Sequence, residues 1–411
     1  MADERGTRPR ILVFATHYLP ACKAGGPVQS IHNLVETLGD EFDFHVVTSD
    51  RDLGDSSPYS DVPLDRWTEV GKARVFYGTR RALGLSGLSR FFRDIRPDVV
   101  YLNSYFSRTF SILPLLARRA GFEGTRCGWV IAPRGEFSAG ALAIKSRRKH
   151  AFGRFADAFG LHAGLFWQGC STLEADDIRR QRSGRGESIV VAPNLTQQVG
   201  GYLPPTSLAT PPPPLEICFL SRVSPKKNLD FAIEALARVR VPVRFHVYGP
   251  KEDARYAASC ELSASRCPGN VEVVWHGEVP HDRVQSTLRQ HHLFLFPTRG
   301  ENFGHVIFES FAAGVPALIS DRTPWLDLDD RRVGWVRSLD DVQGFVDVIE
   351  SCAGMSGPDR EAMSRAAHDY AGAFVRNSTA VTATRSLFRE AATTGRRSPT
   401  PTSPQPTAHS R

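Results

Sequence analysis

Two carboxylates stand eight positions apart in the segment RGENFGHVIFESFAAGVPALIS, and their spacing limits the chemistry that they can share. On one helix, Glu301 and Glu309 would be turned apart by about 80° and separated by about 12 Å along the axis. Glu301 precedes the letters NFG, however, and a helical rhythm of apolar residues begins only at Val306 and ends before Gly314. We therefore place Glu301 in a loop and Glu309 on the second turn of a helix.

Free backbone N–H groups lie between the two carboxylates in this arrangement. They belong to Phe303, Gly304 and His305, at the N-terminus of the predicted helix, where anions bind favourably. The carboxylates themselves can accept hydrogen bonds from sugar hydroxyls. A ligand with hydroxyls at two ends and phosphate in the middle fits this pattern, and a nucleotide sugar is such a ligand.

The elements that must position these residues follow an α/β pattern. Short apolar runs alternate with helical patterns in both halves of the chain, which is typical of parallel sheets. The candidate strands of the first half are residues 11–16, 44–49, 73–78, 98–103, 128–133, 164–169 and 188–193. Those of the second half are residues 215–220, 243–248, 271–276, 293–297 and 316–320. Between the halves, PPTSLATPPPP has the composition of a semi-rigid linker.

Length and composition fit a two-domain globular protein. The 411 residues exceed one ordinary core, and 41% hydrophobic with 23% charged residues indicates a soluble chain. No apolar run suits a membrane span and MADERGTRPR is no signal peptide, so we expect a cytoplasmic protein. Seven scattered cysteines without a CxxC pair predict buried thiols. The net charge of +7 favours an anionic partner without identifying it, and we expect no nucleic acid.

Two further motifs follow predicted strands, at the sheet edge where α/β domains bind ligands. After the first strand, Gly25 and Gly26 precede Pro27, a usual first residue of a helix, and permit close approach of a ligand. The alternative is that the glycines only close a turn. After the strand at 215–220, SRVSPKKNLD supplies Arg222 and Lys227, two cations that suit a diphosphate. The alternative there is a solvated basic turn.

These motifs together carry a resemblance to a known family. The segments SRVSPKKNLD and TRGENFGHVIFESFAAGVPALIS resemble the signature of retaining glycosyltransferase family 4, the group 1 glycosyltransferases. HYLPACKAGGPVQSIHNLVETL and APRGEFSAGALAIKS are similar to N-terminal segments of members that assemble bacterial polysaccharides. The resemblance spans about residues 10 to 392. It implies the GT-B fold, an α/β architecture of two Rossmann-like domains whose parallel sheets face each other across a cleft.

The resemblance also implies a domain plan and a reaction. We expect transfer of a sugar from a nucleotide-diphosphate donor to a saccharide or lipid-linked saccharide, with retention of configuration, in exopolysaccharide, O-antigen or capsule assembly. The expected parts are a disordered N-terminus (1–9), an acceptor domain (10–193), a linker (194–214), a donor domain (215–372), a helix crossing back to the first domain (373–392) and a disordered tail (393–411).

By the same resemblance, each motif residue has a role. Arg222 and Lys227 should hold the donor diphosphate, Glu309 the ribose and Glu301 the transferred sugar. The main chain at residues 302–305 should assist, with Gly25 and Gly26 against the diphosphate from the other domain. The catalytic candidates are Arg222, Lys227 and Glu301. The full donor-binding set is Gly25, Gly26, Arg222, Lys227, Glu301, Asn302, Phe303, Gly304, His305 and Glu309.

One position departs from the family pattern. Many members have a histidine after the strand near residue 130, whereas this chain has Arg134 in APRGEF. Arg134 and Glu136 are candidates for contact with the sugar or the acceptor, and the alternative is a structural ion pair in a loop. His17 is a further candidate at the cleft, although a single histidine after a strand is commonly structural.

No metal or other cofactor is expected, and the nucleotide sugar is a substrate. Fixed cations and a helix N-terminus can stabilise the charge on the departing diphosphate before the reaction starts. The letters DLD at residues 327–329 match the DxD pattern of metal-dependent transferases of another fold. Because this stretch follows the donor helix and its next strand in a polar region, we interpret it as a solvated acidic loop.

The segment AIKSRRKHAFGRFADAFG, residues 143–160, predicts a basic helix with phenylalanines. This pattern permits contact with an anionic membrane surface, which would place the enzyme on the cytoplasmic membrane face near a lipid-linked acceptor. The alternative is an ordinary amphipathic helix whose phenylalanines face the core.

Two other functions stay open at this point. A hydrolase or nonhydrolysing sugar epimerase of the same fold would use a similar diphosphate cleft but needs further acid and base residues, which we do not find in the sequence. A non-catalytic scaffold that binds nucleotide sugar is the alternative from another class. A glycosidase fits less well, because its paired carboxylates converge to about 5 to 9.5 Å across one bond.

Overall fold

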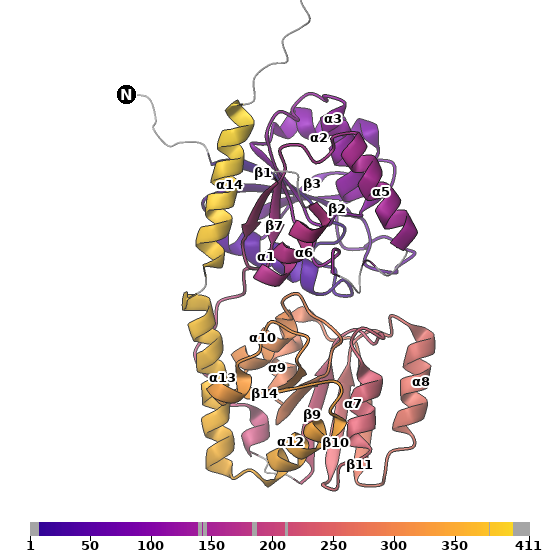
Figure 1. The fold of residues 1–411 in the computed structure, drawn as a ribbon, viewed down its shortest axis with the longest axis vertical. Helices are drawn as coiled ribbons and strands as arrows, with labels where there is room; N and C mark the ends of the chain where they lie inside the picture. Colours follow the sequence, from indigo (N-terminus) through magenta and orange to yellow (C-terminus); the bar gives the residue numbers. More distant parts are fainter. Residues whose placement is uncertain are drawn as a thin grey trace, which may run out of the picture.

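The structure is a computed structural model that describes residues 8–138, 142, 146–182, 187–209, 213–377 and 379–397. Figure 1 shows two domains, each with a central sheet and helices on both faces, stacked end to end. A long pair of helices runs along one side of both domains and ends on the first one. None of the described helices is both long and apolar enough to cross a bilayer.

The first domain contains an eight-stranded sheet in the order β3-β4-β2-β1-β5-β6-β7-β8. All neighbours are parallel except β3 and β4. Its strands are β1 (Arg10–Phe14), β2 (Asp43–Ser49), β3 (Trp67–Val70), β4 (Ala73–Gly78), β5 (Val99–Leu102), β6 (Gly128–Ile131), β7 (Phe166–Gly169) and β8 (Ser188–Val191). Its helices are α1 (Gly26–Leu38), α2 (Leu85–Ile95), α3 (Leu113–Arg119), α5 (Ser146–Ala158), α6 (Thr172–Arg182) and α14 (Ala380–Arg397), with a π-helical turn at Arg108–Ile112.

The strand β1 shows why this sheet is buried on both faces. Ile11 and Val13 pack with α1 and α14, whereas Leu12 and Phe14 pack with α2 and α3. Successive side chains of a strand point to opposite faces, so a continuous apolar run can fill two cores. That is why such runs predicted the strands well.

The second domain contains a six-stranded parallel sheet in the order β11-β10-β9-β12-β13-β14. Its strands are β9 (Leu215–Leu220), β10 (Val243–Tyr248), β11 (Val271–Gly277), β12 (Leu293–Phe296), β13 (Ala317–Ser320) and β14 (Gly334–Arg337). Its helices are α7 (Leu229–Leu236), α8 (Ala254–Ala264), α9 (Val284–Leu288), α10 (His305–Ala312), α11 (Leu328–Arg331), α12 (Val342–Gly354) and α13 (Gly357–Asn377), with 3-10 turns at Thr206–Ala209 and His281–Arg283. One apolar cluster fills this domain.

Two strands, β3 and β14, were not among the predicted ones. The strand β3 is a four-residue antiparallel edge strand with partly exposed side chains, joined to β4 by a turn at Gly71 with φ of 57°. The strand β14 is also four residues long and pairs only with β13 among the described strands. Short edge strands carry too few buried residues for a clear pattern.

The crossing helix and the two chain ends differ from the expected bounds. Helix α13 continues to Asn377 against α10 of the second domain, and the helix that covers the first domain is α14, which begins at Ala380 rather than 373. Its Phe388 packs against Phe42, Phe44 and Tyr101.

The expected disordered tail was placed too early at 393. Helix α14 runs on to Arg397, and a Cβ on Gly395 would come within 2.2 Å of the Gly128 backbone, so glycine there lets the last turn approach β6. At the other end, Arg8 donates to the Gly39 carbonyl oxygen at 2.9 Å, so residues 8 and 9 are part of the fold rather than of a disordered start. Residues 1–7 and 398–411 lie outside the described residues.

The expected linker is only partly a free connector. The Asn33 side chain donates to the Leu195 carbonyl oxygen at 3.1 Å, and the Ser207 hydroxyl donates to the His291 carbonyl oxygen at 2.8 Å. The segment from 194 to 209 therefore rests on both domains, and residues 210–212 lie outside the described part.

Candidate functional site

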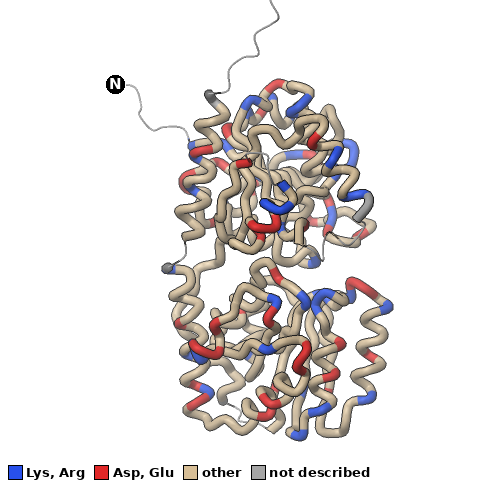
Figure 2. Tube along the Cα trace, viewed as in Figure 1, with Lys and Arg blue, Asp and Glu red and all other residues tan. Residues whose placement is uncertain are grey.

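A cavity of about 330 Å³ lies between the domains. The second domain contributes the ends of β9 to β11 and the start of α10, and the first domain contributes the start of α1 and the turn after β6. We call these sides the donor wall (Arg222, Lys227, Glu301, residues 302–305 and Glu309) and the facing wall (Gly25, Gly26, Ser30, Arg134 and Asn194). Figure 2 shows Lys and Arg residues along the edge of the second domain that faces the first.

On the donor wall, Lys227 and Glu301 form an ion pair. The Lys227 Nζ lies 2.6 Å from Glu301 Oε1, and both side chains are mostly buried, at 12% exposure each. The Thr298 hydroxyl donates to the same carboxylate oxygen at 3.0 Å. Both contacts go to Oε1, so the second Glu301 oxygen is available to a ligand.

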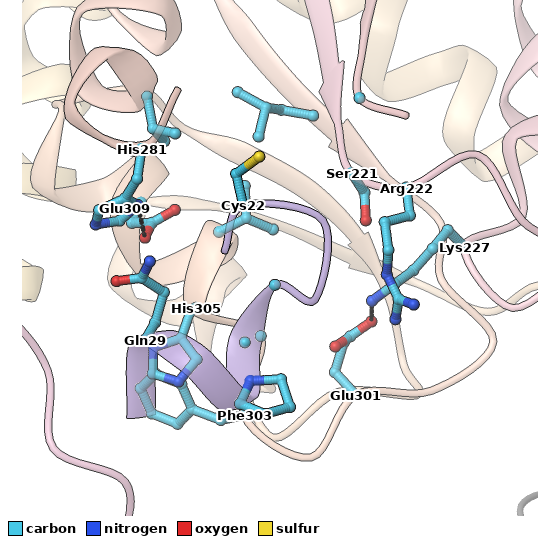
Figure 3. Close-up of a pocket in the computed structure, with 18 of the residues that line it drawn as sticks. Cys22, Gln29, Ser221, Arg222, Lys227, His281, Glu301, Phe303, His305 and Glu309 are labelled. Carbon is cyan, nitrogen blue, oxygen red and sulfur yellow. Dashed lines mark hydrogen bonds and ion pairs between the residues drawn. The ribbon is translucent and has the colours of Figure 1, made fainter. Parts of the chain in front are cut away.

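Arg222 follows β9 and lies at the same end of the cavity (Figure 3). Its Nη1 lies 2.6 Å from Glu252 Oε1, with side chains 30% and 38% exposed. Pairs as exposed as this one contribute little stability, so the guanidinium can turn toward an anionic ligand at small cost.

The helix α10 presents its N-terminus to the cavity as expected. Gly304 adopts φ of 80° just before the first turn, which favours glycine, and no side chain caps the helix. Phe303 anchors the preceding loop, because its ring packs on Trp325 and its carbonyl oxygen accepts a hydrogen bond from Trp325 Nε1 at 2.5 Å. The first N–H groups of the helix have no intrahelical partners and remain for an anion.

Glu309 lies at the other end of the donor wall, away from Glu301 in Figure 3. It is 8% exposed, and burial raises the pKa of its carboxyl to about 7. His281 Nδ1 lies 4.0 Å from Glu309 Oε1. The structure thus separates the two glutamates to opposite ends of one cavity, as the sequence predicted.

The facing wall meets the donor wall through α1. Gly25 has φ of 66° and precedes the helix, whose first residue is Gly26. A Cβ on Gly26 would touch the His305 ring at 3.4 Å. The Ser30 hydroxyl donates to the Gly26 carbonyl oxygen at 3.0 Å and lies 2.9 Å from His305 Nε2, so the imidazole must donate to Ser30. Burial, helped by the charge of Arg134, lowers the pKa of His305 to about 3.

Arg134 lines the cavity within a set of neutral groups. Its guanidinium donates to Asn103 Oδ1 at 2.8 and 3.2 Å, to the Tyr101 hydroxyl at 2.8 Å and to Asn194 Oδ1. The Tyr101 hydroxyl in turn donates to Gln168 Oε1 at 2.7 Å. The expected alternative of an ion pair with Glu136 is therefore wrong.

Glu136 and His17 do not line the cavity. The Glu136 carboxylate accepts hydrogen bonds from the Ser104 hydroxyl and the backbone N–H groups of Tyr105 and Phe106, at 2.9, 2.6 and 3.0 Å. His17 Nδ1 lies 3.2 Å from the Arg51 carbonyl oxygen. Both side chains therefore support loops of the first domain and lie outside the lining of this cavity.

Several lining residues were not predicted. They include Cys22, Gln29, Ser30, Lys226, Glu278 and His281. Gln29 and Ser30 follow Gly26 by one helical turn, so the α1 pattern could have indicated them. Glu278 and His281 follow β11, and the rule that ligands bind after parallel strands could have found them too. All seven cysteines are free, and four of them are buried as expected, whereas Cys127 and Cys267 are partly exposed and Cys22 is exposed.

The acidic stretch at 327–329 lies in a network of its own. The Tyr370 hydroxyl donates to Asp327 at 2.7 Å, and Asp329 forms an ion pair with Arg337 at 2.8 Å. These contacts fix the short helix α11 before β14, so the stretch that we expected to be a solvated loop begins a helix instead. Within the described part of the chain, no three His, Cys, Asp or Glu side chains come together as metal ligands would.

Residues 146–158 of the basic segment form α5, residues 143–145 lie outside the described part, and the phenylalanines divide between two environments. Phe152 packs into the first domain against Tyr105. Phe155 and Phe159 are 41% and 55% exposed and pack on each other with ring centroids 4.3 Å apart. The alternative in which the phenylalanines face the core is thus correct for Phe152 only.

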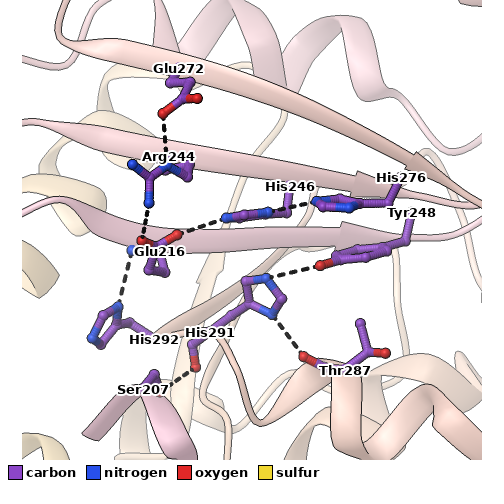
Figure 4. Close-up of polar contacts among 10 residues, drawn as sticks. All are labelled: Ser207, Glu216, Arg244, His246, Tyr248, Glu272, His276, Thr287, His291 and His292. Atoms are coloured by element: carbon purple, nitrogen blue, oxygen red, sulfur yellow. Dashed lines mark hydrogen bonds and ion pairs between the residues drawn. The ribbon is translucent and has the colours of Figure 1, made fainter. Parts of the chain in front are cut away.

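A second titratable cluster lies on the sheet of the second domain, outside the cavity (Figure 4). His246 bridges Glu216 and His276 at 2.7 and 2.8 Å, and Arg244 pairs with Glu216 and Glu272. Each of these groups has a partner on a neighbouring strand. We interpret the cluster as cross-strand pairing that stabilises the sheet.

Two family models of glycosyl transferases match consecutive parts of the chain. Residues 25–194 match the family model of the glycosyl transferase 4-like domain, and residues 206–369 match that of glycosyl transferases group 1. Together the two matches cover most of the chain. No curated protein sequence matches the chain.

Three solved structures have the same two-domain architecture. Anabaena HepE, in complex with UDP-glucose, is 15% identical, with 93% of this chain and 99% of that chain covered and a TM-score of 0.66. Sucrose-phosphate synthase from Thermosynechococcus elongatus is 14% identical, with coverages of 93% and 99% and a TM-score of 0.69. WaaG, a glycosyltransferase involved in lipopolysaccharide biosynthesis, is 15% identical, with coverages of 95% and 100% and a TM-score of 0.61. The predicted GT-B fold is confirmed.

Proposed function

Because the chain joins a glycosyl transferase 4-like domain to a group 1 glycosyl transferase domain, it belongs to the group 1 glycosyltransferases, and we propose its reaction on that basis. The proposed reaction transfers a sugar from a nucleotide-diphosphate donor to a saccharide or lipid-linked saccharide, with retention of configuration and without a metal ion. The proposed role is in the assembly of a bacterial surface polysaccharide, in the cytoplasm.

The observation that carries this proposal is the layout of the donor wall. Lys227 and Arg222 lie at one end with Glu301, Glu309 lies at the other, and the α10 N-terminus opens between them. A nucleotide sugar would place its ribose at Glu309, its diphosphate at the cations and helix N-terminus, and its sugar at Glu301. HepE, which has this fold, was solved with UDP-glucose, and this supports a nucleotide sugar as the donor here.

Charge stabilisation is the chemistry that this wall can supply. As the bond to the sugar breaks, the leaving diphosphate gains negative charge, and Arg222, Lys227 and the α10 N-terminus would meet it in fixed positions. Both cations form ion pairs with glutamates, Glu252 and Glu301, and would bind phosphate oxygens in their place. Attack by the acceptor from the face that the diphosphate leaves gives retention.

An anionic membrane surface is proposed as a further partner, through α5. Phe155 and Phe159 form an exposed aromatic pair, and Arg148 and Arg154 are exposed on the same helix. Aromatic side chains that enter the headgroup region beside basic ones bind anionic lipid. In a flotation assay, the wild type should float with vesicles of anionic lipid, and a Phe155→Ser/Phe159→Ser variant should not. Vesicles of neutral lipid serve as the control.

The test of the proposed reaction is a thermal-shift panel of nucleoside diphosphates and their sugars, followed by assay of nucleoside diphosphate release with lipid-linked acceptors. A ligand at 100 times its dissociation constant should raise the free energy of unfolding by about 2.7 kcal/mol. Binding without release under any acceptor would favour the scaffold, and release of free or epimerised sugar would favour the hydrolase or epimerase.

A further inference from the structure

The charged residues that line the cavity differ in how their charge is balanced. Lys227 and Arg222 each face a glutamate, at 2.6 Å in both cases. Every hydrogen bond of the Arg134 guanidinium to the described residues instead goes to a neutral oxygen of Tyr101, Asn103 or Asn194. The nearby Glu174 carboxylate accepts from the backbone N–H groups of Gly135 and Cys170, at 2.5 and 2.8 Å.

Hydrogen-bond donors exceed acceptors around Arg134. The guanidinium has five N–H groups, and these contacts occupy four of them. Asn103 is 7% exposed, and its Oδ1 already accepts from Arg134, which fixes the orientation of its amide. The Asn103 Nδ2 group has no hydrogen-bond partner among the described residues. A buried donor without an acceptor is costly, so the surroundings of Arg134 are short of hydrogen-bond acceptors.

The backbone at Arg134, in the turn after β6, is strained. Arg134 adopts φ of 55°, a left-handed conformation that is unfavourable for a residue other than glycine and often occurs at ligand sites. The surrounding groups hold it in place, because Asn103 follows β5 and Asn194 follows β8. Both asparagines are nine-tenths buried.

The turn also lies against the loop that would hold the transferred sugar. A Cβ on Gly135 would come within 2.5 Å of the Asn302 side chain, so the glycine lets the two loops touch. Cys170 Sγ lies 3.7 Å from the Asn302 carbonyl oxygen on the same side. The turn that carries Arg134 is thus held next to Asn302, the residue after Glu301.

We propose that Arg134, held in place by Asn103 and Asn194, determines donor specificity by binding the carboxylate of a hexuronic acid as the transferred sugar. This inference rests on the proposed glycosyl transfer. Arginine suits a carboxylate because charged hydrogen bonds from a rigid guanidinium are among the stronger ones in proteins. A neutral hexose offers only hydroxyl oxygens, which accept weaker hydrogen bonds from a guanidinium than a carboxylate does.

The experiment compares ligands on the full-length protein by calorimetry. The panel contains UDP and GDP, a neutral hexose conjugate of each, and the matching hexuronic acid conjugate. Wild type should bind one hexuronic acid conjugate about 10- to 100-fold more tightly than its neutral hexose counterpart. Arg134→Gln should remove this preference and leave the affinity for the free nucleoside diphosphate unchanged. Arg222→Gln, the matched control, should weaken all three ligands of the series alike.

A second variant tests the inference without removing Arg134. Asn103→Asp keeps the shape of the side chain but provides an internal carboxylate, so the hexuronate preference should fall by a similar factor with Arg134 in place. If wild type binds a nucleoside diphosphate but binds its hexose and hexuronic acid conjugates with equal affinity, the inference is overturned while the proposed function stands. An equal loss for all ligands in Arg134→Gln also overturns it, because the residue would then act on the diphosphate. No binding of any panel member contradicts the proposed function itself.

Discussion

The two walls of the cavity handle positive charge in opposite ways. On the donor wall, each of Arg222 and Lys227 is paired with a carboxylate, and the pairs are partly open to solvent or to the cavity. On the facing wall, Arg134 is held by neutral, buried groups from two strand ends. A paired cation can exchange its partner for a ligand, whereas a cation held by neutral groups is fixed in place. The first arrangement suits charge that develops during a reaction, and the second suits recognition of a charge that is always present.

The largest test of this comparison is removal of the donor-wall cations. Lys227→Ala and Arg222→Ala should each lower the transfer rate about 10²- to 10³-fold, because each removes one fixed group that meets the developing charge. The rate of nucleoside diphosphate release, measured with the native fold checked by circular dichroism, decides the matter. Near-normal turnover in both variants would remove these residues from the diphosphate site.

The next effect concerns the buried carboxyl of the donor wall. Because the pKa of Glu309 is raised to about 7 in the folded state, the fold favours its protonated form. Below its ordinary pKa of 4.5 the carboxyl causes no loss of stability, and the cost grows as the pH rises from 4.5 to about 7, to about 3 kcal/mol above pH 7. Relative to Glu309→Gln, wild type should therefore lose unfolding free energy between pH 5 and pH 8. Denaturation curves of both proteins at the two pH values measure this difference, and parallel pH dependences would contradict it.

A smaller effect should separate the two ends of the donor wall. Glu309→Gln should weaken nucleoside diphosphate and intact donor alike, by about 1 to 3 kcal/mol, as expected for loss of a charged hydrogen bond. Glu301→Gln should leave nucleoside diphosphate affinity nearly unchanged and lower turnover, since a contact with the transferred sugar matters as its bond breaks. Equal loss of nucleoside diphosphate affinity in the two variants, by calorimetry, would show that the carboxylates do not lie at opposite ends of the donor.

The smallest expected effect is that of metal removal. If cations and the α10 N-terminus supply the stabilising charge, EDTA should leave the transfer rate unchanged within error. Loss of activity in EDTA with recovery on adding Mn²⁺ would reverse this expectation and direct attention back to residues 327–329.

The donor wall could be predicted from the sequence because its geometry is set locally. A glycine before the helix, the apolar rhythm and the glycine after it fix where Glu301 and Glu309 lie, and Arg222 directly follows a strand. The facing wall depends on the order of strands in the sheet. Tyr101 and Asn103 lie 33 and 31 residues before Arg134, and Asn194 lies 60 residues after it. They meet only through the order β5-β6-β7-β8. No local pattern contains that order.

Glu136 shows a second limit of sequence reasoning. Its closeness to Arg134 along the chain suggested a shared site or an ion pair, yet Arg134 and Gly135 both adopt positive φ values, of 55° and 79°. These residues reverse the chain, and the Glu136 carboxylate then binds the backbone of Tyr105 and Phe106. Side-chain direction after such a turn depends on backbone angles that composition does not reveal.

The return of α14 to the first domain makes that domain discontinuous in sequence, with the whole second domain inserted between two of its pieces. During synthesis the ribosome completes the second domain before it releases the helix that covers Phe42, Phe44 and Tyr101. One apolar face of the nascent first sheet therefore remains uncovered while more than 180 residues are added. Slow translation or a truncated message would prolong this exposure, and a fragment that ends near residue 193 should associate with chaperones or aggregate.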